Sequence, residues 1–316
     1  MKSILVTGGL GYVGGRIVKH LLANSNSEIV VSSRRKVDVA AFFRSSRVKF
    51  CPAQTLTDIS HPLPEGVDAI IHLAATNEIQ AAADPADSIE VNVRDSYMLL
   101  QKAVRQQVKR FLYFSTAHVY SSPLEGDITE ELCPKPLHPY AITHKGFEDF
   151  LWAAHKKKEI EGIIIRLSNS FGAPIAADVN RWSLLVNDLC RQAVINRKMT
   201  LKSSGLQLRD FVTLTDVCRA VNHLLHLPVA KVYDGIFNLG GDHVISIFEM
   251  AKLVQRCFEE HSSLVVPLIR PEPDFQEKIL PLSFHSKRLV KSGFVWKRNV
   301  EEELNYLIEF CIRHFS

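Results

Sequence analysis

The first half of the chain alternates short apolar, β-branched runs with segments whose apolar residues recur at helical spacing. Residues 4–6 (ILV) predict a buried strand, and apolar residues then recur every three or four positions over residues 13–22, as on an amphipathic helix. The same alternation continues to residue 167. It predicts strands over residues 4–6, 28–32, 48–51, 69–73, 111–115 and 163–167, and long helices over residues 88–106 and 140–157.

This alternation also predicts the fold class. Strands that are joined through helices run parallel, and the crossover helices cover both faces of the sheet. We therefore expect an α/β protein with a doubly wound parallel sheet of the Rossmann type, in which a ligand binds beyond the carboxyl ends of the strands. The first domain should cover residues 1–168, with residues 209–224 returning to it. Prolines and polar loops interrupt the rest, so residues 169–316 are expected to form a smaller C-terminal α/β domain.

Composition narrows the class of protein without indicating a chemistry. Of the 316 residues, 46% are hydrophobic and 23% are charged, which is ordinary for a soluble globular protein. The net charge of +4 is too small to indicate a nucleic-acid partner. No apolar run is long enough to span a membrane, and the first residues do not resemble a signal peptide. Six single cysteines without metal-ligand spacing are typical of free thiols, so we expect a cytoplasmic protein with no metal site and no membrane partner.

A glycine-rich loop lies directly between the first predicted strand and its helix. The stretch VTGGLGYVGG places Gly8, Gly11 and Gly14 at intervals of three residues. Glycines here allow a tight turn and a close approach of the backbone to a phosphate, and the helix N-terminus adds free N–H groups. Because the loop follows a strand and opens a helix, it predicts a dinucleotide site in the first domain. The alternative is that the glycines serve only the turn.

The end of the second predicted strand bears on the choice between NAD and NADP. A site for NAD commonly has an acidic residue there, which binds the ribose 2′-hydroxyl. This chain instead has the stretch VVSSRRK, with Ser33 and Arg34 in that region. A guanidinium matches a 2′-phosphate in charge and in geometry. We expect NADP, with NAD as the alternative; the competing explanation is that the arginines only end the strand in solvent.

Seven segments together resemble the extended short-chain dehydrogenases/reductases, in particular the NAD(P)-dependent sugar-nucleotide epimerase/dehydratase family. The resemblance covers nearly the whole chain and is more specific for the fold than for the reaction. The segments are TGGLGYVGG (7–15), DAIIHLAA (68–75), VNVRDSYMLLQKA (91–103), YFSTAHVY (113–120), IIIRLSNSFGAP (163–174), LQLRDFVTLTDVCRA (206–220) and IFNLGGD (236–242).

The resemblance implies roles for individual residues. In that family a hydride passes between a nicotinamide and a sugar carbon, a tyrosine transfers the hydroxyl proton, and a serine or threonine binds the reacting oxygen. Tyr140 and Thr116 match these two positions. The implied cofactor contacts are Gly8, Gly11, Tyr12, Val13, Gly14, Ser33, Arg34, Leu73, Ala74, Ala75, Asn92, Tyr140 and His144. The implied substrate contacts are Thr76, Asn169 and Arg209, with residues 169–316 as the substrate-binding domain and a nucleotide sugar as the substrate. The family also implies a homodimer.

Two positions depart from the family's 4,6-dehydratases. Those enzymes carry an Asp-Glu pair directly after the catalytic threonine and use it to eliminate water. Ala117 and His118 occupy these positions here. We therefore expect epimerisation or ketone reduction, and not 4,6-dehydration.

A further departure concerns the family's lysine, four residues after the tyrosine, which binds the cofactor ribose and favours the tyrosinate. In PYAITHKGFED that position holds His144, and Lys145 follows it. Residues four apart share a helix face, whereas Lys145 is rotated by roughly 140° from Tyr140. Glu148 keeps the family's spacing from the tyrosine, which favours a true substitution by His144. The alternative is a kinked helix that swings Lys145 inward.

The consequences of this substitution are open at the level of sequence. His144 can keep the ribose contact as a hydrogen-bond donor. Its reference pKa near 6.5 makes it a cation only at lower pH. Ketone reduction starts from a protonated tyrosine and suffers least from the missing lysine. We expect catalysis by Tyr140, Thr116 and His144 in an NAD(P)-dependent epimerase or ketone reductase; the rival is a non-catalytic dinucleotide-binding regulator or scaffold.

Overall fold

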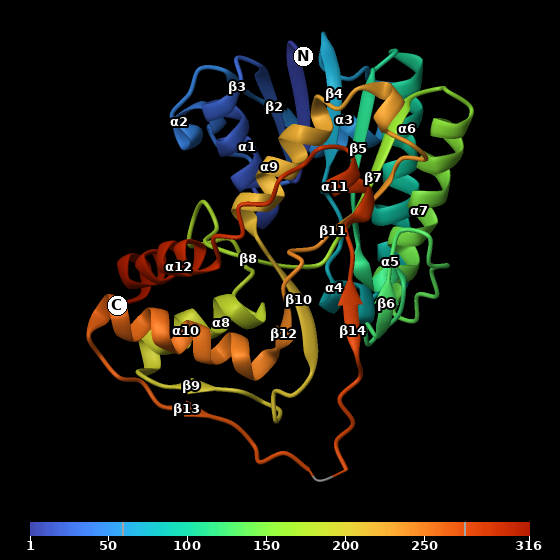
Figure 1. The fold of residues 1–316 in the computed structure, drawn as a ribbon. Coiled ribbons are helices and arrows are strands. Elements are labelled where there is room, and N and C mark those ends of the chain that lie inside the picture. Colours follow the sequence, from blue (N-terminus) through green and yellow to red (C-terminus); the bar gives the residue numbers. More distant parts are fainter. Residues whose placement is uncertain (59, 275) are drawn as a thin grey trace.

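The computed structural model describes residues 1–58, 60–274 and 276–316. Its centre is a seven-stranded parallel sheet with the strand order β11-β7-β5-β4-β1-β2-β3 (Figure 1). The predicted α/β class and Rossmann-type sheet are therefore confirmed. The strands are β1 (Ser3–Thr7), β2 (Glu28–Ser33), β3 (Val48–Pro52), β4 (Val67–His72), β5 (Arg110–Thr116), β7 (Glu161–Leu167) and β11 (Ile236–Leu239).

Helices cover both faces of this sheet because its strands are apolar on both sides. In β1, Ile4 and Val6 pack under α1 (Tyr12–Asn24) and α9 (Leu214–Leu225). Leu5 points the other way and packs under α6 (Ser96–Arg105) and α7 (Pro139–Lys156). Such continuous apolar strands are typical of a parallel sheet between two helix layers. Shorter elements complete this part: α2 (Val39–Phe43), α3 (Ala53–Thr57), α4 (Glu78–Ala83), α5 (Pro85–Ile89), α11 (Lys287–Lys291), β6 (Gly126–Ile128) and β14 (Leu282–Phe284).

The long helix expected over residues 88–106 is not a single α-helix. It consists of α5, a π-helical segment over Glu90–Asp95, and α6. A π-helical turn shifts the side chains that follow it relative to the preceding ones, and such turns are frequent at functional sites. Here the segment contains the predicted cofactor residue Asn92.

The second part of the chain forms its own apolar core below the sheet in Figure 1. Its helices are α8 (Leu185–Asn196), α10 (Ile247–Ser262) and α12 (Val300–Phe315). Its strands are β8 (Asn169–Phe171), β10 (Leu208–Thr213) and β12 (Val244–Ser246), which form one small sheet, and β9 (Met199–Thr200) and β13 (Leu268–Ile269), which form another. The chain returns to the large sheet twice. The first return brings α9 onto α1 and β11 beside β7, and the second brings α11 onto β11. Both β11 and α11 lie inside the stretch predicted as substrate-binding.

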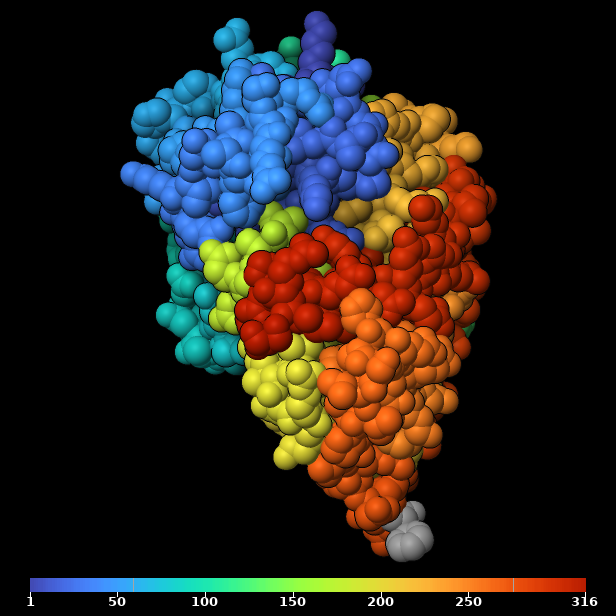
Figure 2. Space-filling model, turned by 90° about the vertical axis from the view of Figure 1, so that its left-hand side faces the viewer, coloured from blue at the N-terminus to red at the C-terminus, as the bar shows by residue number. Residues whose placement is uncertain are grey.

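Buried polar contacts join the two parts. Arg16 of α1 pairs with Glu303 of α12 at 2.8 Å, and the Tyr12 hydroxyl donates to the carbonyl oxygen of Gly172 at 3.0 Å. The red C-terminal residues accordingly lie directly beneath the blue N-terminal ones in Figure 2. Tyr12 is predicted as a cofactor contact. Its hydroxyl here connects the end of the glycine loop to the second part of the chain. Within the described residues, no helix has the length and apolarity needed to cross a membrane.

Candidate active site

A cleft of about 870 Å³ lies at the carboxyl ends of the central strands, between the large sheet and the second part of the chain. Its walls include the glycine loop, the ends of β2, β4 and β5, the start of α7 and residues of β8 and β10. Every predicted site residue lines this cleft except Asn92. A ligand at this edge of a parallel sheet is reached by several loops at once, as the sheet topology predicts.

The glycine loop turns tightly between β1 and α1. Gly8 has a φ of +65°, and its N–H donates to the carbonyl oxygen of Ser32 at 3.0 Å. A Cβ atom on Gly14 would lie 2.3 Å from the Gly8 carbonyl oxygen, so a larger residue does not fit there. Gly11 caps α1 without a side chain, which leaves the N–H groups of the first turn available at the cleft wall. This wall has the donors that a phosphate requires.

The end of β2 carries no negative charge. The Ser33 hydroxyl accepts a hydrogen bond from the backbone N–H of Arg35 at 3.0 Å, and the Arg35 side chain forms an ion pair with Asp178 in the segment after β8. Arg34 is exposed at the cleft wall and forms no ion pair with any described residue. Its guanidinium is therefore available to an anionic group of a ligand.

A chain of hydrogen bonds fixes the loop after β4. The Thr7 hydroxyl accepts from the N–H groups of Leu73 and Ala74, each at 3.1 Å, and lies 2.7 Å from His72 Nδ1. Since its oxygen is the acceptor in two contacts, Thr7 donates to Nδ1, and His72 donates from Nε2 to the Ser96 hydroxyl at 2.8 Å. Burial lowers the pKa of His72 to about 3, so the ring is neutral and the direction of this chain is fixed.

Asn92 supports the cleft from behind. Its Oδ1 accepts from the Thr76 N–H at 2.8 Å, and its Nδ2 donates to the Thr143 hydroxyl at 3.0 Å. The Thr76 hydroxyl lies 2.8 Å from the Ser88 hydroxyl. The side chains of both Asn92 and Thr76 are thus engaged with the protein, and Asn92 ties the loop after β4 to α7.

Tyr140 lies in the first turn of α7, close to the end of β5. Pro139 occupies the first helical position, and the His138 side chain caps the helix by accepting from the Tyr140 N–H at 3.2 Å. Burial raises the pKa of Tyr140 to about 12, against the opposing effects of Arg181 and of a hydrogen bond with Thr116. The phenol is therefore protonated at neutral pH.

His144, and not Lys145, faces Tyr140. The two ring centroids are 4.5 Å apart, with the ring planes at 74°. The helix α7 runs from Pro139 to Lys156 without a break, and Lys145 forms an ion pair with Asp149 one turn further along. The alternative in which a kink turns Lys145 inward is therefore wrong.

His144 has no charge at neutral pH. Burial lowers its pKa to about 3. Its Nδ1 atom lies 2.6 Å from the Tyr113 hydroxyl, and its Nε2 atom is buried with no hydrogen-bond partner among the residues that the structure describes. Because His144 lines the cleft, one ring nitrogen is left for a ligand, but the ring supplies no positive charge to Tyr140.

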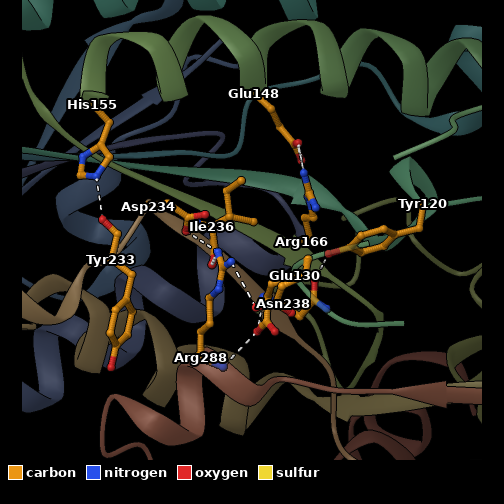
Figure 3. A network of polar contacts seen from close by, with 11 residues as sticks. Tyr120, Glu130, Glu148, His155, Arg166, Tyr233, Asp234, Ile236, Asn238 and Arg288 are labelled. Carbon is orange, nitrogen blue, oxygen red and sulfur yellow. Dashed lines mark hydrogen bonds and ion pairs between the residues drawn. The ribbon is translucent and has the colours of Figure 1, made fainter. Parts of the chain in front are cut away.

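A buried ion pair holds α7 on the sheet below these residues (Figure 3). Glu148 of α7 reaches down to Arg166 of β7 at 2.7 Å, and both side chains are almost fully buried. The Arg166 guanidinium also lies 4.8 Å from the centre of the Tyr120 ring, and the Tyr120 hydroxyl donates to Asn238 at 2.7 Å. The ion pair thus fixes how α7 lies on the sheet, and with it the positions of Tyr140 and His144.

Asn169 and Arg209 lie on the wall formed by the second part. Asn169 Nδ2 donates to the Asp210 carbonyl oxygen at 3.0 Å, which joins β8 to β10. The Arg209 side chain forms neither a hydrogen bond nor an ion pair within the described part of the chain, and burial lowers its pKa. The next acidic residue along the chain after Asp210 is Asp216, which forms an ion pair with Arg219 at 2.6 Å. The cleft therefore contains a half-buried cation that lacks a protein counter-ion.

The family model described as the NAD dependent epimerase/dehydratase family matches residues 4–240, well over half of the chain. The chain belongs to this family. UDP-glucuronic acid decarboxylase 4 of Arabidopsis thaliana is 27% identical over 270 residues, which cover 83% of this chain and 58% of that protein. The chain therefore spans less than two thirds of the length of this relative. The dTDP-D-glucose 4,6-dehydratase of Homo sapiens is 27% identical over 276 residues, which cover 83% of this chain and 75% of that protein.

The solved structures of similar fold include a third kind of enzyme. UDP-glucuronic acid 4-epimerase from Bacillus cereus, in complex with UDP-glucuronic acid and NAD, superposes with a TM-score of 0.80 at 23% identity, over 98% of this chain and 99% of that chain. At this identity the likeness shows the fold alone. The resemblance to the epimerase/dehydratase family is confirmed, and the names of these relatives cover decarboxylation, dehydration and epimerisation.

Several residues near the cleft were not predicted from the sequence, and three of them contact one another or the catalytic residues. Tyr113 contacts His144, while Glu78 and Arg181 both line the cleft and form an ion pair at 3.3 Å. Tyr113 lies inside the family-like segment YFSTAHVY, but no pattern in one sequence links it to a helix residue 31 positions later. Glu78 and Arg181 come from separate segments whose proximity depends on how the two parts of the chain pack.

Proposed function

We propose that this family member reduces a ketone on a nucleotide-activated sugar with NAD(P)H. One observation carries the proposal: Tyr140 is a protonated phenol in the cleft, and the neutral ring of His144 faces it where the family has a cation. Such a phenol is suited to donating a proton to an oxygen that gains negative charge, and poorly suited to starting as a base. Thr116 accepts from the N–H of His118 at 3.2 Å and hydrogen-bonds to Tyr140, so its hydroxyl lies where it can bind the same oxygen.

The residues of the cleft fit a nicotinamide dinucleotide. Besides the glycine loop, four buried polar atoms of residues that line the cleft have no partner among the described residues: Ser32 Oγ, Ser115 Oγ, His118 Nδ1 and His144 Nε2. The glycine loop would hold the pyrophosphate and His144 a ribose hydroxyl. When bound, the reduced cofactor supplies the hydride.

The choice of NADP over NAD is supported by the end of β2. Arg34 is exposed and forms no ion pair with the residues that the structure describes, and Ser32–Arg35 contains no acid; both features favour a 2′-phosphate. The Bacillus cereus epimerase was solved with NAD, so NAD is the alternative.

A nucleotide sugar is the substrate class that suits the second wall of the cleft. Arg209 is a cation without a counter-ion among the described residues, which favours a diphosphate. Asn169 lines the same wall, and its partner across β8 and β10 is Phe211, two residues after Arg209. The solved relatives include one in complex with UDP-glucuronic acid, which carries such a diphosphate.

Epimerisation is the second candidate, because family members with this fold catalyse it. It combines an oxidation and a reduction at one carbon, so Tyr140 must accept a proton in the oxidative step. With its pKa raised to about 12, Tyr140 is rarely ionised at neutral pH, so that step begins from a scarce form. We do not expect 4,6-dehydration, because neither Ala117 nor His118 carries a carboxylate.

The test is incubation with a panel of nucleotide sugars and their 4-keto derivatives, with NADPH or NADH. We expect substrate-dependent loss of the reduced nicotinamide absorbance, and a reduced sugar by mass spectrometry. Epimerisation leaves the absorbance unchanged, so products are analysed in every case. Tyr140→Phe is the control and should bind cofactor without turnover. Binding without turnover across the whole panel would instead favour a non-catalytic regulator.

A homodimer and a cytoplasmic location complete the proposal. Apolar side chains are exposed on α6 and α7, namely Tyr97, Ile142, Phe150 and Trp152, and the Tyr97 and Phe150 rings lie 4.8 Å apart. Such a patch favours a protein partner, and a second copy is the one that we propose. Phe150→Glu should then halve the mass in sedimentation experiments. Six cysteines with free thiols support a reducing compartment.

A further inference from the structure

Tyr113 is the one side chain that hydrogen-bonds the ring of His144 among the described residues. It belongs to β5 and is 2% exposed, and its ring packs against Phe147 at 4.6 Å and against His72 at 5.7 Å. Its hydroxyl lies 2.6 Å from His144 Nδ1 and makes no other hydrogen bond within the described residues. The hydroxyl and the imidazole therefore form an isolated buried pair.

The direction of this hydrogen bond decides which ring nitrogen of His144 carries the proton. A neutral imidazole has one N–H and one acceptor nitrogen. If Nδ1 carried the proton, it would donate to the Tyr113 oxygen, and the phenol proton would be buried without an acceptor. Leaving a buried donor unpaired is unfavourable, so the arrangement in which Tyr113 donates to Nδ1 is preferred. Nε2 then carries the N–H.

We propose that Tyr113 is a positioning residue, which holds His144 as the Nε2–H tautomer and so directs an N–H donor into the cleft, toward a ribose hydroxyl oxygen of the cofactor. The inference rests on the dinucleotide binding proposed above. It explains why Nε2 is buried, lines the cleft and has no protein partner in the described chain.

This arrangement differs in kind from a lysine at the same position. A lysine ammonium has three N–H donors and needs no neighbour to decide which atom donates. An imidazole has one, and without Tyr113 its two tautomers become similar in energy, so that part of the population presents an acceptor to the cofactor. Tyr113 and His144 are therefore expected to act as a unit, and the hydroxyl of Tyr113 should become dispensable once residue 144 no longer has tautomers.

The first test reads the tautomer directly, in the protein without ligand. Two-bond proton–nitrogen correlation spectra of nitrogen-15 histidine distinguish Nε2–H from Nδ1–H, and the His144→Gln variant identifies the His144 signals. We expect a single Nε2–H form in the original chain and a mixture of tautomers in Tyr113→Phe. An unchanged Nε2–H form in Tyr113→Phe would overturn the proposal.

The second test measures NADP affinity by calorimetry in three backgrounds. With His144 present, Tyr113→Phe should weaken binding by about twofold, because roughly half of the molecules then present the Nδ1–H tautomer. In the His144→Lys and His144→Gln backgrounds the same change should leave the affinity unchanged. Glutamine serves as the second background because its amide N–H groups do not depend on a tautomer.

The matched control is Tyr120→Phe, which also removes a buried hydroxyl with one side-chain partner, Asn238 at 2.7 Å, outside the cleft. An equal loss of affinity in Tyr120→Phe, or in Tyr113→Phe on all three backgrounds, would mean that Tyr113 is merely structural. If the original chain binds no dinucleotide, the proposed function fails, and the tautomer spectra still decide the role of Tyr113.

Discussion

Restoring the family's cation beside Tyr140 is the most direct test of how the substitution at His144 shapes the reaction. The change is His144→Lys. In the structure the Tyr140 and His144 rings are 4.5 Å apart between centroids, on consecutive turns of α7. An ammonium group roughly 5 Å from the phenol oxygen, at an effective dielectric constant of about 20, favours the phenolate by about 3 kcal/mol, or about 2 pKa units.

Solvent reduces this effect, because Tyr140 is half-buried at an open cleft. We therefore expect the pKa of Tyr140 to fall from about 12 by roughly one to two units. The tyrosinate fraction at neutral pH would then rise by about tenfold to a hundredfold. Alcohol oxidation starts from tyrosinate, so its rate should rise by up to the same factor. Ketone reduction ends at that tyrosinate, and the overall equilibrium constant is fixed, so its rate should rise in the same proportion.

The assay has two readouts. Ultraviolet difference titration, with Tyr140→Phe subtracted, reports the tyrosine pKa, and single-turnover nicotinamide absorbance reports each direction with the same sugar. His144→Gln is the control, since it removes the imidazole without adding charge and should leave the tyrosine pKa in place. Unchanged rates in a folded His144→Lys protein, or an unmoved tyrosine pKa, would refute the electrostatic reasoning.

Three further predictions follow from the buried and exposed charges. Burial lowers the pKa of both His72 and His144 to about 3, whereas in the unfolded chain these rings bind a proton below about pH 6.5. The free energy of unfolding should therefore be highest above pH 6.5 and fall as the pH drops toward 3, by about 2 kcal/mol for each ring at pH 5. In urea titrations, His144→Gln should remove half of this pH dependence. Arg34→Ala should weaken NADP binding by about tenfold and leave NAD binding unchanged, which calorimetry with both cofactors measures. Glu148→Gln should destabilise the protein by about 3–5 kcal/mol in thermal unfolding, because it leaves the Arg166 charge buried and unpaired, whereas replacing both with methionine should restore most of the loss.

The sheet was predictable from the sequence because its strands are apolar on both faces. The run Ser3–Thr7 is buried throughout, and such a run bounded by a glycine loop has few alternatives to a central parallel strand. The strand β11 was not assigned to this sheet. It has four residues, and its place beside β7 depends on a crossover from the second part of the chain, which no local pattern encodes.

The site divides in the same way between local and long-range information. Helical periodicity was sufficient to predict that His144, and not Lys145, shares a face with Tyr140. It was not sufficient for the side chains whose partners come from other segments. Asn92 is expected to contact a cofactor, and in the structure its amide joins Thr76 to Thr143. It lies in a π-helical segment, which α-helical periodicity in the sequence does not predict.

The charge of His144 shows most clearly what the sequence could not supply. A histidine at this position is compatible with a cation, a hydrogen-bond donor or an inert ring, and the sequence gives no basis for choosing among them. Burial lowers the pKa of the ring and so argues against the cation, while a buried Nε2 without a partner among the described residues argues against an inert ring. What remains is a donor whose orientation depends on Tyr113, a residue of a different layer of the fold. The loss of one lysine thus changes two properties that the lysine combined. The ribose contact can pass to an imidazole held by a neighbouring phenol, whereas the neutral imidazole does not supply a positive charge beside Tyr140. An enzyme altered in this way is expected to retain cofactor binding while proton transfer through Tyr140 is slowed in both directions, and the rates gained in His144→Lys should measure that loss.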